Sequence, residues 1–335
     1  MSIDLCTQYL GLKLRNPLVV AASPLSSELH MLQRLEQAGA AAAVMSSLFE
    51  EQIEDEQSKV FDLAPAGTRN YSTSGASLSA LDNYNSGLDG YLRHIEAAKK
   101  AVSIPIIGSL NGCQRGPWIR FARLIQDAGA DALELNIFFV PTDPQMTATK
   151  VEQHYLDVVG AVRDEITIPL AVKIGPYFNA LANMARRLIA AGADGLVLFN
   201  RFLQPDIDLN RVAVMPRLTL STREELRVPL RWIAILRPQL TISLAATSGI
   251  HQGEDVAKVL LAGADIAMIA STLIQHGPEH LSRMRSDLER IFQEKGWHSV
   301  EQIKGMISHQ HVQSRGALER ANYVQSVTSF KADRA

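Results

Sequence analysis

The phrase QAGAAAAVM at 37–45 returns three times along the chain, as DAGADALEL at 127–135, AAGADGLVL at 190–198 and LAGADIAMI at 261–269. Each copy follows an amphipathic stretch, contains Ala-Gly-Ala and runs on into apolar residues. This pattern predicts a helix that ends at a glycine in the left-handed conformation, followed by a buried strand. Strands that follow helices and are apolar on both faces are typical of parallel sheets with right-handed crossovers.

Four further apolar segments alternate with these repeats: NPLVVAAS (16–23), IPIIGSLNG (104–112), IPLAVKIG (168–175) and LTISLAATSG (240–249). Together they give eight candidate strands separated by helical segments, which predicts an α/β fold of the (β/α)₈ TIM barrel type. A doubly wound sheet is the alternative, but eight regular units favour closure. We expect one domain over residues 1–335, with a helical tail from about residue 278 that closes the barrel.

The composition of the chain limits the kinds of molecule and metal site that we expect it to bind. The chain has 335 residues, a net charge of −2 and a pI near 6.5, which does not favour nucleic acid or an anionic membrane as partner. The charge-dense run from Glu50 to Glu56 is expected to be a solvated loop or helix face. Two cysteines, Cys6 and Cys113, are too few for a multi-cysteine zinc site or an iron–sulfur cluster. Without a signal peptide or an apolar run of membrane-spanning length, we expect a cytoplasmic protein.

Two segments are longer than a minimal barrel requires. Residues 50–90 form a Ser/Gly/Asn-rich insertion after the second strand, and residues 202–229, rich in Pro and Arg, follow the sixth. Both leave the carboxyl ends of strands, where barrel enzymes carry their active sites. Loops of this length on that face are usually lids or binding loops.

The carboxyl ends of the predicted strands carry polar or small residues. These are Ser23, Ser46, Ser47, Asn111, Asn136, Lys173, Asn200, Thr247, Ser248, Gly249, Ser271 and Thr272. Because the set contains no histidine, carboxylate pair or Cys/His cluster, we expect neither a metal site nor paired-carboxylate chemistry. Ser248, Gly249, Ser271 and Thr272 follow the last two strands, where this fold usually binds phosphate, although tight turns alone also need small residues.

Lys173 lies within the otherwise apolar strand segment AVKIG, and a lone buried ammonium is costly. It could form an ion pair, for example with Glu134 on the adjacent strand. It could act as a Schiff-base nucleophile. It could also hold negative charge on a reduced flavin, a role that the neighbouring Asn136 and Asn200 favour, since amides suit the edge of a flavin or pyrimidine ring.

Five segments together resemble the dihydroorotate dehydrogenase family, class 1 type: LGLKLRNPLVVAASP (10–24), AGADALELNI (128–137), PLAVKIGPYFN (169–179), AGADGLVLFN (191–200) and MIASTLIQHGP (268–278). The resemblance spans roughly Leu10 to Gly277. It implies an FMN-containing barrel that oxidises the CH–CH bond of dihydroorotate or a related ring substrate in pyrimidine biosynthesis.

The resemblance also assigns roles. Residues implied to approach FMN are Ala22, Ser23, Asn111, Asn136, Lys173, Ser248, Gly249, Ser271 and Thr272. Lys173 would stabilise the anionic reduced flavin. Asn85, Asn136 and Asn200 would bind the substrate. The electron acceptor would be a diffusible molecule or a separate redox subunit, and a homodimer is an open expectation.

The chain departs from the family pattern at two places. Ser46 stands where the family has a lysine in Thr-Lys-Ser. Phe139 stands where the family has its catalytic cysteine or serine, and Pro141 replaces a substrate-binding asparagine. A phenyl ring cannot accept a proton, so the catalytic base is left unassigned, and Phe138 and Phe139 indicate a more apolar substrate.

Three nearby residues are weaker candidates for a relocated base: Thr142, Asp143 and Cys113. Two other functions stay open. One is a catalytically altered or inactive accessory flavoprotein, and the other is a flavin-free barrel lyase that uses Lys173 as a Schiff-base nucleophile.

Overall fold

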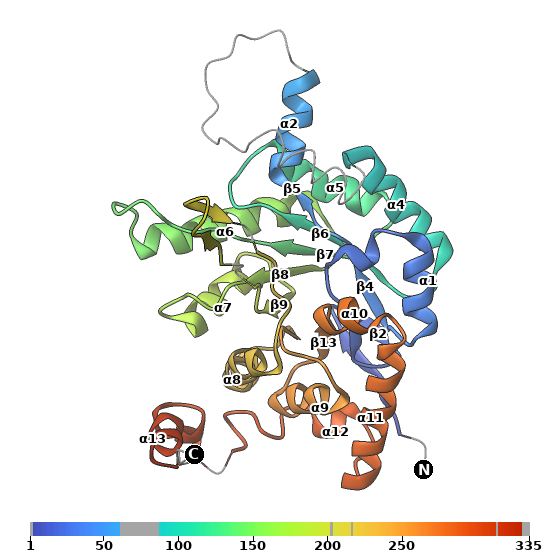
Figure 1. Ribbon diagram of the computed structural model, residues 1–335, viewed down its shortest axis with the longest axis vertical. Helices are drawn as coiled ribbons and strands as arrows, with labels where there is room; N and C mark the ends of the chain where they lie inside the picture. The colour runs from blue at the N-terminus through green and yellow to red at the C-terminus, as the bar shows by residue number, and fades with distance from the viewer. Residues whose placement is uncertain (1–2, 61–86, 202–203, 216, 313, 330–335) are drawn as a thin grey trace.

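A closed ring of parallel strands forms the centre of the computed structural model, which describes residues 3–60, 87–201, 204–215, 217–312 and 314–329 (Figure 1). In ring order the strands are β3 (Leu18–Val20), β4 (Ala42–Val44), β6 (Ile106–Asn111), β7 (Ala132–Asn136), β8 (Leu170–Ile174), β9 (Gly195–Leu198), β12 (Ser243–Thr247) and β13 (Ile266–Ile269). β13 pairs with β3, and β4 pairs with β6, so the ring closes. This confirms the (β/α)₈ barrel and excludes the doubly wound alternative.

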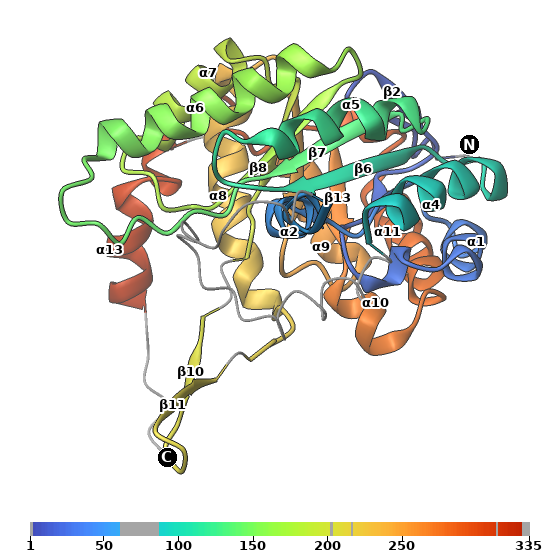
Figure 2. The same cartoon turned by 90° about the horizontal axis from the view of Figure 1, so that it is seen from above.

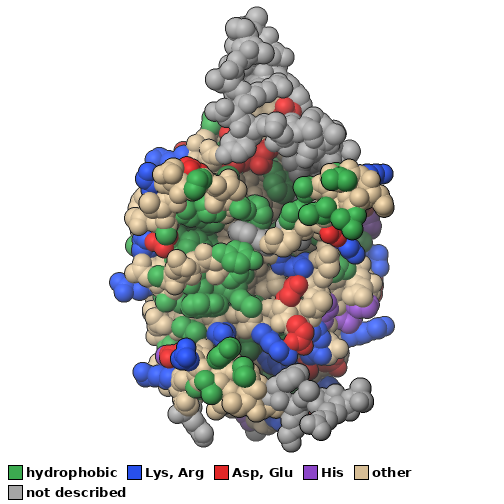
Figure 3. Space-filling view, turned by 60° about the vertical axis from the view of Figure 1, so that its left-hand side comes forward, with side chains coloured by type: hydrophobic (Ala, Val, Ile, Leu, Met, Phe, Trp, Pro, Cys, Tyr) green, Lys and Arg blue, Asp and Glu red, His purple; other side chains and the backbone are tan. Residues whose placement is uncertain are grey.

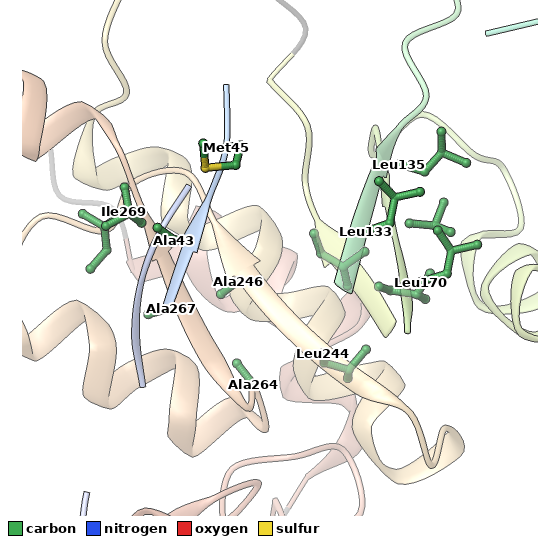
Figure 4. Close-up of a cluster of buried hydrophobic side chains, with 14 of the residues drawn as sticks. Ala43, Met45, Leu133, Leu135, Leu170, Leu244, Ala246, Ala264, Ala267 and Ile269 are labelled. Atoms are coloured by element: carbon green, nitrogen blue, oxygen red, sulfur yellow. The ribbon is translucent and has the colours of Figure 1, made fainter. Parts of the chain in front are cut away.

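Helices cover the outside of the ring. They are α1 (Leu29–Gln37), α4 (Gly87–Ala101), α5 (Arg120–Asp127), α6 (Ala148–Glu165), α7 (Leu181–Ala190), α8 (Arg227–Leu236), α9 (Gly253–Ala262) and α11 (His280–Lys295). Figure 4 shows side chains such as Leu133, Leu135, Leu170 and Leu244, which lie in the buried layer between strands and helices. Alternate strand residues point the other way, into the barrel, as the two-residue period requires.

The four repeated phrases form helix ends, as predicted. Gly39, Gly129, Gly192 and Gly263 all have positive φ, between +95° and +119°. In the last three repeats the following aspartate has a role that the sequence did not reveal. The carboxylates of Asp131, Asp194 and Asp265 accept hydrogen bonds from a backbone N–H at the start of the preceding strand, at 2.7, 2.9 and 2.7 Å.

Each of these aspartates also pairs with a cation, Lys99, Arg163 or Arg237 respectively. The carboxylate thus links two neighbouring strands and a helix at the amino-terminal end of the barrel. Its charge is balanced and its lone pairs are used.

A short hairpin, β1 (Thr7–Tyr9) and β2 (Leu12–Leu14), closes this amino-terminal end and was not predicted. Tyr9, Leu10 and Leu14 are buried against inward-facing barrel residues such as Val19 and Ile266. The Leu10 N–H donates to Ser243 Oγ at 2.8 Å, at the start of β12. The bottom of the barrel is therefore filled by side chains and closed to solvent-borne ligands.

The remaining elements lie outside the ring. β5 (Leu48–Phe49) leads into α2 (Glu50–Val60), and β10 (Asp206–Asp208) pairs with β11 (Ala213–Met215) in a ribbon that projects from the body of the molecule (Figure 2). Short helices are α10 (Ser271–His276), α12 (Val300–Ile303), η1 (Pro24–Ser26), η2 (Pro117–Ile119), η3 (Arg223–Leu226), η4 (Arg237–Gln239) and η5 (Arg315–Ala317).

The carboxyl-terminal tail is helical, as expected, but only part of it packs on the barrel. α11 packs on α9 and buries Leu281, Met284, Leu288 and Phe292. The last helix, α13 (Arg320–Ser329), buries none of its residues. The tail therefore contributes the eighth covering helix and then leaves the core.

Candidate active site

A cavity of about 550 Å³ opens at the carboxyl ends of the strands, and we call it the barrel cavity. Most of the predicted site residues line it: Ala22, Ser23, Ser47, Asn111, Asn136, Lys173, Asn200, Thr247, Ser248, Gly249 and Ser271. Ser46 and Thr272 are buried behind the wall instead. Asn85 lies outside the described residues, so its predicted contact with the substrate stays a prediction.

The inward-facing side chains of β6, β7 and β8 form a buried polar network at the floor of this cavity. Asn136 and Lys173 are register partners on adjacent strands, and Glu134 precedes Asn136 by one inward step. The Asn136 amide donates to Ser109 Oγ at 3.0 Å and to Glu134 Oε1 at 3.3 Å. Ser109 Oγ lies 2.8 Å from Ser47 Oγ. These bonds fix the orientation of Asn136 before any ligand binds.

Lys173 forms the ion pair with Glu134 that the sequence suggested, with Nζ 3.4 Å from Oε1. The lysine side chain is 10% exposed and the glutamate is fully buried. An ammonium has three donors, and Glu134 takes one of them. The side chain is therefore engaged in a buried ion pair at the floor of the cavity, the first of the three roles considered for it.

The turns after β12 and β13 line another part of the cavity with small residues. Ser248 and Gly249 have φ of +78° and +74°, so two successive residues are left-handed, a backbone conformation found in turns that bind anions. A Cβ at Gly249 would lie 2.4 Å from the Leu226 nitrogen, which explains the glycine. Nearby, the buried hydroxyls of Ser23 and Thr272 have no hydrogen-bond partner among the described residues. Such a surface suits a phosphate or another anion.

Two glutamates at the start of α2 also line the barrel cavity, and sequence reasoning missed them. Glu50 and Glu51 belong to the charge-dense run that was expected to be a solvated face, and that expectation was wrong for them: Glu50 is 8% exposed. The available signal was their position directly after β5, at the carboxyl end of the barrel. Burial, with the nearby carboxylates of Glu50 and Glu54, raises the pKa of Glu51.

The three residues considered as relocated bases do not fit that role well. Thr142 and Asp143 are exposed and do not line the barrel cavity. Cys113 does line it, but its Sγ donates to Glu50 Oε1 at 3.1 Å. Burial and the Glu50 charge raise the pKa of this thiol, so the thiolate is disfavoured.

Only one of the two phenylalanines after Asn136 lines the barrel cavity. Phe138 lines the barrel cavity, so the predicted apolar wall is present. Phe139, which the sequence resemblance matches to the family's base, does not line this cavity and lies against His154, with ring centroids 5.0 Å apart. Figure 3, which brings the left-hand side of Figure 1 forward, shows hydrophobic side chains gathered in patches on that face.

Comparison with known proteins places the chain in a family. A model of the family described as dihydroorotate dehydrogenase matches residues 4–292. The chain belongs to the dihydroorotate dehydrogenase family. The match confirms the resemblance found in the sequence and the predicted class of enzyme, a dihydroorotate dehydrogenase-like oxidoreductase.

Curated relatives agree with this placement. The chain is 25% identical to the catalytic subunit of dihydroorotate dehydrogenase B (NAD(+)) from Thermoplasma acidophilum, over 90% of this chain and 98% of that protein. It is 24% identical to the corresponding subunit from Methanothermobacter thermautotrophicus, over 90% of this chain and 97% of the relative. The Listeria monocytogenes subunit is 29% identical over 69% of this chain and 78% of its own length.

Among the described residues, no group of three or more His, Cys, Asp or Glu side chains could hold a metal ion. In the same part of the chain, no helix is both long and apolar enough to span a membrane.

Proposed function

We propose that this protein is an FMN-dependent oxidoreductase that acts on the CH–CH bond of dihydroorotate or a related planar carbonyl compound. The observation that carries the proposal is the barrel cavity, where Lys173 and Asn136 stand opposite the anion-binding turns after β12 and β13. Membership of the dihydroorotate dehydrogenase family supports the same reading.

The residues present fit FMN. The left-handed turn at Ser248 and Gly249, with Ser271, would hold the phosphate, and the Ser23 hydroxyl, which has no partner among the described residues, would gain one. Ala22, Asn111 and Lys173 would lie along the ring system. When bound, the flavin supplies hydride-accepting chemistry. The two ammonium donors of Lys173 that Glu134 leaves available would stabilise negative charge at the ring.

Oxidation of a CH–CH bond removes a hydride from one carbon and a proton from its neighbour, so a base is needed. We assign the proton to the Glu51 carboxylate, because it lines the cavity and its raised pKa makes it a stronger base than an ordinary carboxylate. Asn136 and Asn200 would orient the substrate carbonyl groups, and Asn85 is a further candidate. The reaction then does not require the side chain at position 139.

We also propose an electron acceptor for this chain. The relatives are named as catalytic subunits, which supports a separate redox subunit as the electron acceptor of this chain. A diffusible acceptor is the alternative, and a homodimer and a cytoplasmic location stay predictions.

The test starts with the purified protein and its visible spectrum. We expect bound FMN with the absorbance of oxidised flavin. We then expect anaerobic mixing with dihydroorotate, or with a small panel of related dihydro compounds, to bleach that absorbance. A preparation that cannot be loaded with flavin would contradict the proposal. A loaded protein that no member of the panel bleaches would instead favour the accessory flavoprotein.

A further inference from the structure

A second cavity, also of about 550 Å³, adjoins the barrel cavity at the carboxyl ends of β7 and β8. Five aromatic side chains line it, and we call it the aromatic cavity: Phe138, Phe139, Tyr155, Tyr177 and Phe178. Phe138 lines both cavities. The Phe138 side chain thus forms part of the wall of both cavities.

The two cavities differ in chemistry. Among the described residues, no lysine, arginine, aspartate or glutamate lines the aromatic cavity, whereas Lys173, Glu50 and Glu51 line the barrel cavity. Burial raises the pKa of the Tyr155 hydroxyl to about 12, so this side chain stays neutral at physiological pH. A charged or phosphorylated group would lose its hydration there without gaining a counter-charge, so the space suits an uncharged apolar group.

Packing among the rings fixes the shape of this space. Tyr155 and Phe178 meet edge to face with centroids 5.1 Å apart. Phe139 lies against His154 and packs on the hydrophobic core. Because these rings already hold one another in place, an entering planar group would meet a preformed surface and lose little to reorganisation.

We infer that the aromatic cavity binds the aryl group of the substrate, whose conjugated carbonyl end lies in the barrel cavity near Lys173 and Asn136. The inference rests on the proposed function and narrows the substrate class to aryl-substituted planar carbonyl compounds. It also gives the segment 138–141 a role. That segment forms the wall of an apolar specificity site in place of a catalytic loop.

The experiment compares two probes that differ only in their apolar end, crotonamide and cinnamamide, titrated into the oxidised FMN-loaded protein. Binding is followed by the change in the flavin absorption spectrum, so no turnover is needed. We expect cinnamamide to bind about 10- to 100-fold more tightly than crotonamide, because its phenyl ring is buried. Equal affinity, or no binding of either amide, would overturn the inference and leave the flavin-binding part of the proposed function intact.

Substitutions in the aromatic cavity test whether the phenyl ring of cinnamamide binds there. Val151→Trp, which fills the aromatic cavity from α6, is expected to reduce the cinnamamide preference at least 10-fold while the crotonamide affinity stays unchanged. Tyr177→Ala should reduce the cinnamamide preference by a smaller factor. Tyr323→Ala is the matched control, because Tyr177 and Tyr323 are similarly exposed, at 70% and 68%, and Tyr323 lies on α13.

Flavin content and thermal unfolding establish that each variant is folded. A folded, FMN-loaded Val151→Trp protein that keeps the full cinnamamide preference would place the phenyl group elsewhere and overturn the inference. A wild-type chain that cannot be loaded with FMN would overturn the proposed function, and the inference with it.

Discussion

The two ends of the barrel use polar residues in opposite ways. At the amino-terminal end, Asp131, Asp194 and Asp265 each bind a strand N–H and a cation, so their hydrogen-bonding capacity is used within the protein. At the carboxyl end, Glu134 takes one of the three Lys173 donors, and the buried Ser23 hydroxyl has no hydrogen-bond partner among the described residues. Both side chains line the barrel cavity, where a bound ligand can supply the missing partners.

The comparison predicts that changes at the carboxyl end alter activity, whereas changes at the amino-terminal end alter stability. The largest effect is expected for Glu51→Gln, which keeps the shape of the side chain but removes the base. We expect the rate of flavin reduction by the substrate to fall about 10²- to 10⁴-fold, measured by anaerobic stopped-flow absorbance.

The matched control for that variant is Glu54→Gln. Glu54 lies one helical turn further along α2, and its pKa is also raised by burial and by Glu50, but it does not line the barrel cavity. In the Glu54→Gln enzyme, the substrate should reduce the flavin at the wild-type rate. A Glu51→Gln enzyme that is as fast as this control would remove Glu51 from the mechanism.

Lys173 is expected to affect both activity and stability, and a double substitution separates the two effects. Lys173→Met leaves the buried Glu134 without a counter-charge and should destabilise the protein by about 3–5 kcal/mol, measured by urea unfolding. Adding Glu134→Gln should restore most of this stability, because the uncompensated charge is gone. Flavin reduction should stay impaired in the double variant, since the ammonium is still absent. Recovery of both properties would mean that Lys173 acts only in the fold.

At the amino-terminal end, Asp265→Asn should reduce stability without affecting catalysis. The amide oxygen still accepts from the Leu244 N–H, but Arg237 and Lys304 lose their shared counter-charge. We expect a loss of about 2 kcal/mol in the free energy of unfolding, with an unchanged rate of flavin reduction per folded protein.

Asp206→Asn on the exposed β10–β11 ribbon is the control, because it also breaks an aspartate–arginine pair. Its effect on stability should stay below about 0.5 kcal/mol, since exposed pairs contribute little. If the two substitutions reduce the free energy of unfolding equally, the aspartates of the repeats contribute no more stability than an exposed ion pair.

The smallest expected effect is a pH-dependent gain in stability in Glu51→Gln. Because burial raises the Glu51 pKa in the folded state, the fold binds this proton more tightly than the unfolded chain does, and stability falls as the pH rises from about 4.5 through the folded pKa. At pH 7 the variant should therefore be more stable than wild type by about 0.5 kcal/mol. The difference should vanish below pH 4.5, which thermal unfolding at both pH values can check.

Much of the site was predictable because, in a barrel, the carboxyl ends of all the strands lie at the same end of the fold. Once the eight strands were assigned, the residue at each carboxyl end was known to face the same mouth, and Asn111, Asn136, Lys173 and Gly249 line one cavity as expected. Glu51 could not be identified in this way. It lies on a helix that follows an extra short strand, β5, and a charged run at the start of such a helix usually faces water.

The sequence by itself determined the barrel, its family and the positions of its strand ends. These rest on local signals, namely the apolar runs of buried strands and the glycines that end helices, which act within a few neighbouring residues. Only the tertiary structure decided that Phe139 lines the aromatic cavity alone while Phe138 lines both cavities, and that Glu50 and Glu51 enter the site. The direction of a loop or helix-end side chain depends on packing against residues distant in sequence, and no local pattern encodes that packing.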